Sequence, residues 1–486
     1  MNKKKLLNIF PIIAYIYLLI PFIIFAVSWM KVYIAVPVVL VIFYCLFSMC
    51  KNPEISLSLE CNKGGLKKII IVALLVAFWV GISGVGGFSY QSDDHTWRNA
   101  IFETLVYNKW PVTSIENIDG ISIERGFSYY MGFWLIPAII GKIFGIGIGY
   151  FAQVLWAIIG ILLFYFGLCI LRHKISIWPL FIFAFFSGMD ILGYYFTGID
   201  MSTVAQSDHL EWWTQFQFSS ITTQLFWVFN QCIPAWLVTL LLLLQKSNRY
   251  IAILLAASMI NCTLPFVGLI PFAFYLVLFR KYENESPKWK SWAKDTFTIE
   301  NILGGGIIGG ISFLFLSKPG SGSDISIFDF SNGGWLVYIV FLGLEIGGIA
   351  FAIYHCHKKN PLFYIAIIWL AICPLLNIYG EVNFCMRASI PALVVLFICT
   401  LQAIEEDFKF KHNLQLAVIA VVIAIGAVTP LHEIVRSISQ TEYKYLSGEG
   451  PVRVESEGMN AVMQNDYESC DIELNYFYQY IAKTKK

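Results

Sequence analysis

Two carboxylates, an imidazole and a guanidinium stand within six positions of this sequence, at Asp93, Asp94, His95 and Arg98. A carboxylate in contact with a hydroxyl group can take its proton while that oxygen forms a new bond. The four residues follow an apolar run that ends near Phe88. Charged side chains beside a membrane span are costly unless they are solvated or used. We therefore expect them to form the reactive edge of a membrane-embedded active site that faces away from the cytoplasm.

The same stretch has the pattern of a helix start. Ser92 is a suitable N-cap, and the helix dipole favours the two acids in the first turn. An apolar flank follows, which predicts an amphipathic helix lying in the headgroup plane. Asp94 and Arg98 are four residues apart on a helix and can form an ion pair, which leaves Asp93 and His95 as the groups of the motif without an assigned partner. Capping alone also places acids at helix starts, so a purely structural role stays open.

A second polar stretch, at about 208–231, is dense in amides, hydroxyls and indoles and leads into an apolar run. Aromatic faces stack on sugar rings, and amides hydrogen-bond to sugar hydroxyls. An aromatic belt at the membrane boundary would explain Trp212, but it does not explain amides at the mouth of a helix. We therefore expect a sugar-binding surface, with His209, Glu211, Trp212, Gln224, Asn230 and Gln231 as candidate contacts.

A third cluster surrounds Arg387, at an outer turn between two apolar runs. A guanidinium can bind a phosphate through two parallel hydrogen bonds, which lysine does less well. The alternative is an arginine that reaches to the lipid headgroups. We predict that Arg387 and the nearby Asn383 contact the substrate. Glu345, inside an apolar run, and Asp190 and Asp200 are weaker candidates.

The sequence does not signal a metal site. The 11 cysteines fall mostly inside apolar runs, where they behave as small hydrophobic residues, and no CxxC pair or Cys/His cluster is evident. A divalent cation held by Asp93, Asp94, His209 and Glu211 is conceivable, and their oxygen and imidazole ligands would suit Mn²⁺, with Mg²⁺ as the other candidate. We do not assign any of the four residues as a metal ligand.

Composition places the chain in a membrane. The 486 residues are 58% hydrophobic and 13% charged, and the mean hydropathy is +0.68. A bilayer core about 30 Å thick needs about 20 apolar residues per helix, and the chain supplies such runs repeatedly. The net charge of +1 indicates no nucleic-acid partner. We expect an all-α polytopic membrane protein.

The apolar runs number about 12 to 14. The first begins after three lysines and has no small-residue cleavage site, so we interpret it as a retained helix. Basic loops at 51–68, 246–249, 280–294, 358–359 and 409–411 indicate the cytoplasmic side. If every run crossed the membrane once, the number of crossings would place the basic residues Arg172 to Lys174 outside the cytoplasm. This parity problem falls in 129–193, so we expect one run to re-enter the membrane or to lie in the interface. The runs lie at about 8–28, 32–50, 69–88, 129–147, 149–171, 176–193, 226–244, 250–262, 264–279, 301–317, 335–354, 362–379, 388–403 and 414–430.

Two regions follow from this division. A polytopic transmembrane domain is predicted over 1–430, with extracytoplasmic loops at about 89–128, 194–225, 318–334 and 380–387. A small extracytoplasmic tail is predicted over 431–486. No organellar signal is evident, which favours a bacterial inner (plasma) membrane.

These features together resemble the C-type (GT-C) integral membrane glycosyltransferases. The resemblance rests on the acidic motif Asp93-Asp94-His95 in the first large outer loop, on the many short spans and on the short tail. It covers the membrane part loosely and does not extend to 431–486. In size the chain is closer to the single-subunit mannosyl- or aminoarabinosyl-transferases than to the oligosaccharyltransferases.

The resemblance implies a sugar donor linked to a polyprenyl phosphate and a lipid, glycan or protein acceptor in the cell envelope. It assigns the base to Asp93 or Asp94, with inversion at the sugar. Arg387, aided by His209, would neutralise the departing phosphate, and apolar grooves would hold the lipid tail. A transporter (flippase) or a polymerase of lipid-linked glycans is the alternative. A transporter would be expected to show internal symmetry and midplane charges, and we see neither in the sequence.

Overall fold

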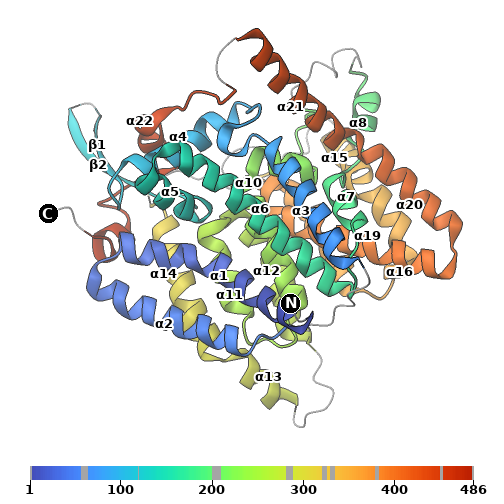
Figure 1. Cartoon of the computed structure of the whole chain (residues 1–486), viewed down its shortest axis with the longest axis horizontal. Helices are drawn as coiled ribbons and strands as arrows, with labels where there is room; N and C mark the ends of the chain where they lie inside the picture. The colour runs from blue at the N-terminus through green and yellow to red at the C-terminus, as the bar shows by residue number, and fades with distance from the viewer. Residues whose placement is uncertain are drawn as a thin grey trace.

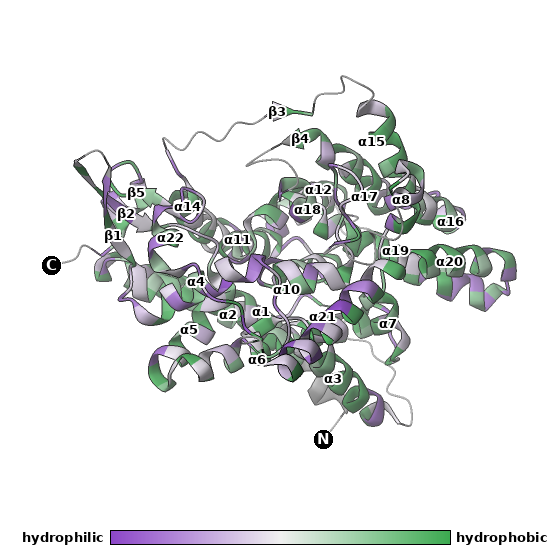
Figure 2. Ribbon diagram, turned by 90° about the horizontal axis from the view of Figure 1, so that it is seen from above, coloured by the Kyte–Doolittle hydropathy of each residue, from purple (hydrophilic) through white to green (hydrophobic). Residues whose placement is uncertain are grey.

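The computed structural model describes residues 3–55, 64–118, 120–199, 209–280, 288–319, 326–328, 334–377, 383–448 and 452–483. These residues form a nearly all-α structure with two small antiparallel sheets (Figure 1). Most of the helical ribbon is hydrophobic (Figure 2). The predicted all-α class is confirmed.

The helices and strands divide between two halves of the chain. The first half contains α1 (Lys3–Trp29), α2 (Val32–Lys51), α3 (Gly65–Gly81), η1 (Val85–Gly87), α4 (Asp94–Tyr107), β1 (Thr113–Ile118), β2 (Ile121–Phe127), α5 (Gly132–Phe144), α6 (Ile146–Leu171), α7 (Trp178–Ala184), α8 (Asp190–Thr197) and α10 (Ile221–Leu244). The second half contains α11 (Ile251–Asn261), α12 (Thr263–Phe279), α13 (Lys288–Thr296), η2 (Glu300–Gly305), α14 (Gly306–Leu316), β3 (Ser326–Ile327), α15 (Gly334–Leu342), η4 (Gly343–Gly347), α16 (Gly348–His357), α17 (Pro361–Ile372), η5 (Cys373–Leu375), β4 (Leu376–Asn377), α18 (Asn383–Ala388), α19 (Ile390–Phe410), α20 (Asn413–Gly426), α21 (Val428–Ser447), α22 (Gly458–Gln464), β5 (Ser469–Asp471) and η6 (Phe477–Ile481).

Six helices in the described part of the chain are long and apolar enough to cross a membrane, which is compatible with a multi-pass membrane protein. They lie at Ile9–Trp29, Val32–Lys51, Ile146–Leu171, Ile221–Leu244, Gly334–His357 and Asn413–Ser447. A bent pair, Trp289–Thr296 with Glu300–Leu316, would add a seventh span. The count of 12 to 14 predicted from the sequence is therefore not reached by this measure. Several predicted runs are shorter apolar helices, among them Gly132–Phe144 and Ile251–Asn261.

The run predicted at 176–193 is broken. Helix α7 ends at Ala184 and α8 begins at Asp190, and each is too short for a bilayer at about 1.5 Å per residue. The break contains Gly188, where any side chain would collide with Glu345. It falls in the region whose parity did not fit single crossings.

Helix α10 lies at the centre of the bundle (Figure 1), and nearly all of its residues are buried. Ser220 caps it by accepting a hydrogen bond from the backbone N–H of Thr223 at 3.0 Å. Val228 has non-helical backbone angles, so the helix is kinked after its polar start. Asn230 and Gln231, the amides predicted to contact a substrate, lie just after this kink.

The C-terminal part of the chain docks onto the first large loop. Strand β5 extends the β1–β2 hairpin, with Cys470 opposite Gly126, and α22 packs against α4. Gln91 accepts from the backbone N–H of Val454 at 3.1 Å. The predicted boundary at 430/431 lies inside α21. In Figure 1, α4, α22 and the hairpin lie at the edge of the molecule opposite the basic helix α13.

Candidate functional site

Helix α4 carries the acidic motif, but it begins later than predicted. Its first residue is Asp94, and Asp93 precedes it in helical conformation without a side-chain cap. The prediction that Ser92 is the N-cap is wrong, because its hydroxyl contacts His95 Nδ1 at 3.2 Å instead. Most residues of α4 are buried by α5, α22 and their neighbours, so the predicted position in a headgroup plane is not shown.

Asp94 is the acid of the motif that faces other charges. Its carboxylate accepts a hydrogen bond from Arg98 Nη2 at 3.0 Å, and its side chain keeps 43% exposure. Burial tends to raise the pKa of Asp94, but Arg98, Arg387 and His95 together outweigh it and lower that pKa. The predicted Asp94–Arg98 pair is therefore present, and Arg387 lies close enough to act on the same acid.

His95 and Asp93 differ from Asp94 in their surroundings. Burial lowers the pKa of His95 to about 3, so its ring is neutral at pH 7. That ring stacks on Phe229 with centroids 5.9 Å apart, and Gly84 lies directly against it. Asp93 is exposed. In this motif the His95 ring is packed inside the protein, Asp93 faces solvent, and Asp94 lies near the charges of Arg98 and Arg387.

Arg387 is a buried cation. Its Nη1 donates to both the side-chain and the backbone oxygen of Asn383, so the two predicted residues act as one unit. Its Nε is buried and has no hydrogen-bond partner among the described residues. Within the same residues, no carboxylate lies within ion-pair distance of Arg387. Residues 378–382, which include Glu381, lie outside the described part.

A small cavity of about 60 Å³ lies beside Tyr130 and Tyr467, two of the tyrosines that act electrostatically on Arg387. By volume it holds about two water molecules. The hydroxyls of these two tyrosines are 3.0 Å apart, and Gln231 Nε2 donates to Tyr130 at 3.1 Å. We call it the tyrosine cavity. It is lined by Ser128, Tyr129, Tyr130, Thr263, Leu264, Leu316, Lys318 and Tyr467.

Two ionisable groups were not predicted from the sequence: Lys318, which lines this cavity, and Glu468, which follows the lining residue Tyr467. Burial lowers the pKa of Lys318 to about 8, and its ammonium group donates to the backbone oxygen of Asp466 at 2.9 Å. Burial raises the pKa of Glu468 to about 7, although Lys318 and Arg98 oppose the shift. Tyr129-Tyr130 at the head of an apolar run was a signal that sequence reasoning passed over. Glu468 had none, because only the docking of the tail brings it against Ser128, whose backbone N–H donates to the Glu468 carbonyl at 2.8 Å.

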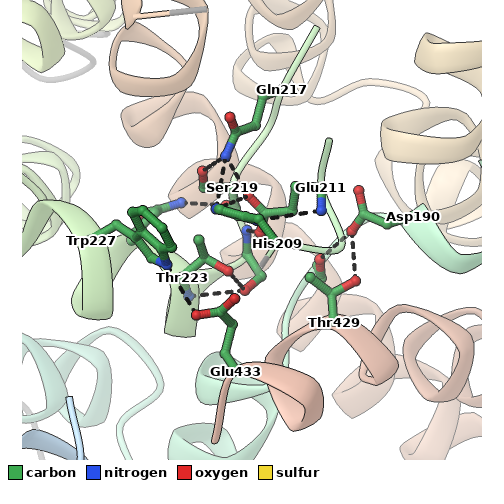
Figure 3. Close-up of polar contacts among 12 residues, drawn as sticks. Asp190, His209, Glu211, Gln217, Ser219, Thr223, Trp227, Thr429 and Glu433 are labelled. Atoms are coloured by element: carbon green, nitrogen blue, oxygen red, sulfur yellow. Dashed lines mark hydrogen bonds and ion pairs between the residues drawn. The ribbon is translucent and has the colours of Figure 1, made fainter. Parts of the chain in front are cut away.

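The stretch at 209–224 forms a closed hydrogen-bonded network rather than an open surface (Figure 3). Glu211 accepts from Gln217 Nε2 at 2.7 Å and from the backbone N–H of Ser220 at 2.8 Å. Gln224 donates to the carbonyl of Ser219 and accepts from Trp236, both at 2.8 Å. We call this set the Glu211 network. Its amides are used to hold the start of α10.

His209 does not fit the role of a cation for a departing phosphate. Its ring lies between Trp212 and Trp227, with centroids at 4.9 and 4.8 Å. Burial lowers the pKa of His209 to about 3, and Arg436 adds to that shift. A neutral imidazole carries no charge to offset a phosphate. Trp212 itself is 54% exposed, which leaves part of its indole open for stacking.

Two further buried acids, Asp190 and Glu345, lie near Glu211 behind this network. Asp190 accepts from Thr429 at 2.7 Å, as Figure 3 shows. Glu345 belongs to the π-helical turn Gly343–Gly347 and packs against Gly188. It interacts electrostatically with Asp190 and Glu211. Residues 200–208, with the weaker candidate Asp200, lie outside the described part.

Asn230 is a buried amide whose polar atoms find no partner in the described chain. Both of its side-chain polar atoms are buried with no hydrogen bond, and so is Gln231 Oε1. Buried amides normally find partners, so these atoms are positions for a bound water or a ligand group. Of the predicted residues, the structure therefore groups Asp94, Arg98, Asn383, Arg387 and Gln231 near the tyrosine cavity, and His209, Glu211 and Gln224 in the Glu211 network.

Asp93, Asp94, His209 and Glu211, the residues considered for a divalent cation, are not arranged as a coordination site in the described structure. These four do not form a group with ligand atoms close together; among the described residues that arrangement occurs elsewhere, at His355, Asp407 and His412. Glu211 is already bonded within its network.

Comparisons of the chain with protein-family models, with curated proteins and with solved structures gave no match.

Proposed function

We propose that the protein is an inverting membrane glycosyltransferase of the GT-C type. It moves a sugar from a polyprenyl-phosphate donor to a lipid, glycan or protein acceptor on the extracytoplasmic side of a bacterial plasma membrane. The observation that carries the proposal is Arg387, a buried guanidinium without a carboxylate partner in the described chain, which acts electrostatically on the accessible Asp94. Burying a cation in this way is costly unless an anion completes the site.

The charges fit the requirements of the reaction. In the proposed step the acceptor oxygen bonds to the anomeric carbon, the bond from that carbon to the phosphate oxygen breaks, and the electron pair leaves with the phosphate. Asp94 takes the acceptor's proton, and Arg98 holds that carboxylate in place. Arg387, with Lys318 at the neighbouring cavity, stabilises the phosphate.

The test is turnover by the full-length protein in nanodiscs. A panel of short-chain polyprenyl-phosphate mannose, glucose and aminoarabinose is offered with membrane lipid extract, and release of polyprenyl phosphate is measured. The proposal predicts release from at least one donor, and a loss of about 10²-fold in Asp94→Asn. No release from any donor, or full activity in Asp94→Asn, would contradict it.

A transporter of lipid-linked glycans is the second candidate, favoured by the cluster of Asp190, Glu211 and Glu345. Buried acids in membrane proteins often carry protons that drive transport. Flipping of a fluorescent polyprenyl-phosphate sugar in proteoliposomes, without its turnover and dependent on a pH gradient, would replace the enzyme proposal with this one.

A further inference from the structure

A second set of ligating side chains, none of which belongs to the proposed active site, lies where α16 ends and α19 turns into α20. Helix α16 ends with His355-Cys356-His357, and α19 brings Asp407 beside this end. The turn after α19 passes through Lys411 with φ +59° and places His412 on the other side of Asp407. The basic loops at 358–359 and 409–411 put this end of the helices on the predicted cytoplasmic side.

The ligand atoms converge. His355 Nε2 lies 2.8 Å and His412 Nδ1 lies 3.0 Å from the same carboxylate oxygen of Asp407. Cys356 Sγ is 3.1 Å from His355 Nε2 and 3.9 Å from that oxygen. Ligands at the bond lengths of a tetrahedral Zn²⁺ site stand about 3.3–3.6 Å apart, so the four distances above fit with shifts of a few tenths of an ångström. The ligand atoms of His355, Asp407 and His412 all lie within 4.8 Å of one another, so the two histidine rings would also have to move toward each other, by about 1.5 Å at most.

Two further observations point to a cation between these groups. The side chain of Asp407 is fully buried, and its Oδ2 has no hydrogen bond. His355 Nδ1 lies 3.1 Å from the carbonyl oxygen of Ala352. Donation to that carbonyl leaves the Nε2 of a neutral ring with a lone pair, which then faces the lone pairs of Asp407. A hydrogen bond from the second ring nitrogen to a carbonyl is how zinc-ligating histidines are usually oriented.

We propose that His355, Asp407 and His412 bind a Zn²⁺ ion, with Cys356 as the fourth ligand. Nitrogen, oxygen and sulfur donors in this number are those that Zn²⁺ selects. The ion would tie the end of α16 to the turn between α19 and α20. His355 and His412 keep 30% and 46% exposure, which leaves a path for the ion to enter. The competing arrangement is a pair of protonated histidines on one carboxylate.

The experiment uses full-length protein purified through a tag without histidine, stripped with chelator and titrated with Zn²⁺ by calorimetry. Wild type is expected to bind one equivalent, and His355→Ala and His412→Ala each to lose at least about tenfold in affinity. His173→Asn is the matched control, because His173 is an exposed histidine on a different loop and asparagine tolerates its positive φ. Its affinity should equal that of wild type.

Two readouts keep the test independent of folding in the variants. Zn²⁺ should raise the melting temperature of wild type and leave that of His355→Ala/His412→Ala unchanged. Co²⁺ in place of Zn²⁺ should give the visible bands of a tetrahedral site, and Cys356→Ser should remove the sulfur-to-metal band. Equal Zn²⁺ binding by wild type and the double variant, or no binding by either, would overturn the proposal in favour of the protonated pair.

Discussion

The tyrosine cavity and the Glu211 network are both polar regions beside α10, and they use their polar groups in opposite ways. In the network Glu211 accepts from Gln217 and from the backbone N–H of Ser220, and beside the network Glu433 Oε2 accepts from Trp227 and Arg436. Near the cavity Arg387 has only Asn383 as a hydrogen-bond partner among the described residues. Buried polar groups whose hydrogen bonds are satisfied stabilise the fold, whereas buried polar groups without a partner are candidate positions for a bound water or ligand. In our proposal, the Glu211 network therefore serves to hold the fold together, and the region around Arg387 binds the substrate.

The largest effect is expected at Arg387. Arg387→Ala removes the charge proposed to stabilise the phosphate and should lower turnover about 10²–10³-fold. It should leave the melting temperature near that of wild type, since no buried carboxylate of the described chain loses a partner. Arg436→Ala is the matched control beside the network, where Glu433 would lose an ion pair of 2.8 Å. A fall in stability without a fall in turnover for Arg387→Ala would reverse the assignment of the two regions.

Glu211 should show the opposite behaviour. Glu211→Ala removes the carboxylate that accepts from Gln217 Nε2 and from the N–H of Ser220, which costs about 1–3 kcal/mol of unfolding free energy. Turnover per folded molecule should change much less than in Arg387→Ala. Denaturation and turnover measured on the same preparation separate the two effects, and an inactive but fully stable Glu211→Ala would place this acid in the site.

Glu468 predicts a pH dependence of stability. Because burial raises the pKa of its carboxyl to about 7, the folded protein holds a proton that the unfolded chain releases near its ordinary value of 4.5. This group's contribution is therefore fully present below pH 4.5 and is lost as pH rises through 7, by roughly 3 kcal/mol at most. Melting temperatures of wild type and Glu468→Gln between pH 5 and 8 should diverge, with the variant falling less. Parallel curves would show that Glu468 is solvated.

Asp93 should show the smallest effect. It is exposed and outside the charge cluster, so Asp93→Asn should lose less than about threefold in turnover, against about 10²-fold for Asp94→Asn. The pair of variants decides between the two acids that the motif left open. Equal losses in both would mean that the acids act as a unit.

The sequence predicted the fold class and part of the site. The long apolar runs predicted where most helices lie, and the four-residue spacing of Asp94 and Arg98 predicted their ion pair. Other features depend on tertiary contacts that no local pattern encodes. Glu468 lies against Ser128 only because β5 adds to β2, and the break between α7 and α8 contains the close approach of Gly188 to Glu345.

The amides of 209–224 were predicted as a sugar-binding surface because their density is unusual at a membrane boundary. Their partners are other members of the same stretch and the start of α10, so hydrogen bonds that could have served a ligand are used internally. The proposed metal site was likewise not predicted from the sequence. His355-Cys356-His357 is a local signal that was missed, but Asp407 and His412 lie more than fifty residues further on and only the fold brings them beside His355.

The most direct test of the central claim is a density map of the protein in nanodiscs with a short-chain polyprenyl phosphate. The account predicts phosphate density within hydrogen-bond distance of the Arg387 guanidinium, beside Asp94 and the tyrosine cavity. Phosphate density at the Glu211 network, or Arg387 turned onto a carboxylate of its own chain with no phosphate beside it, would contradict the account.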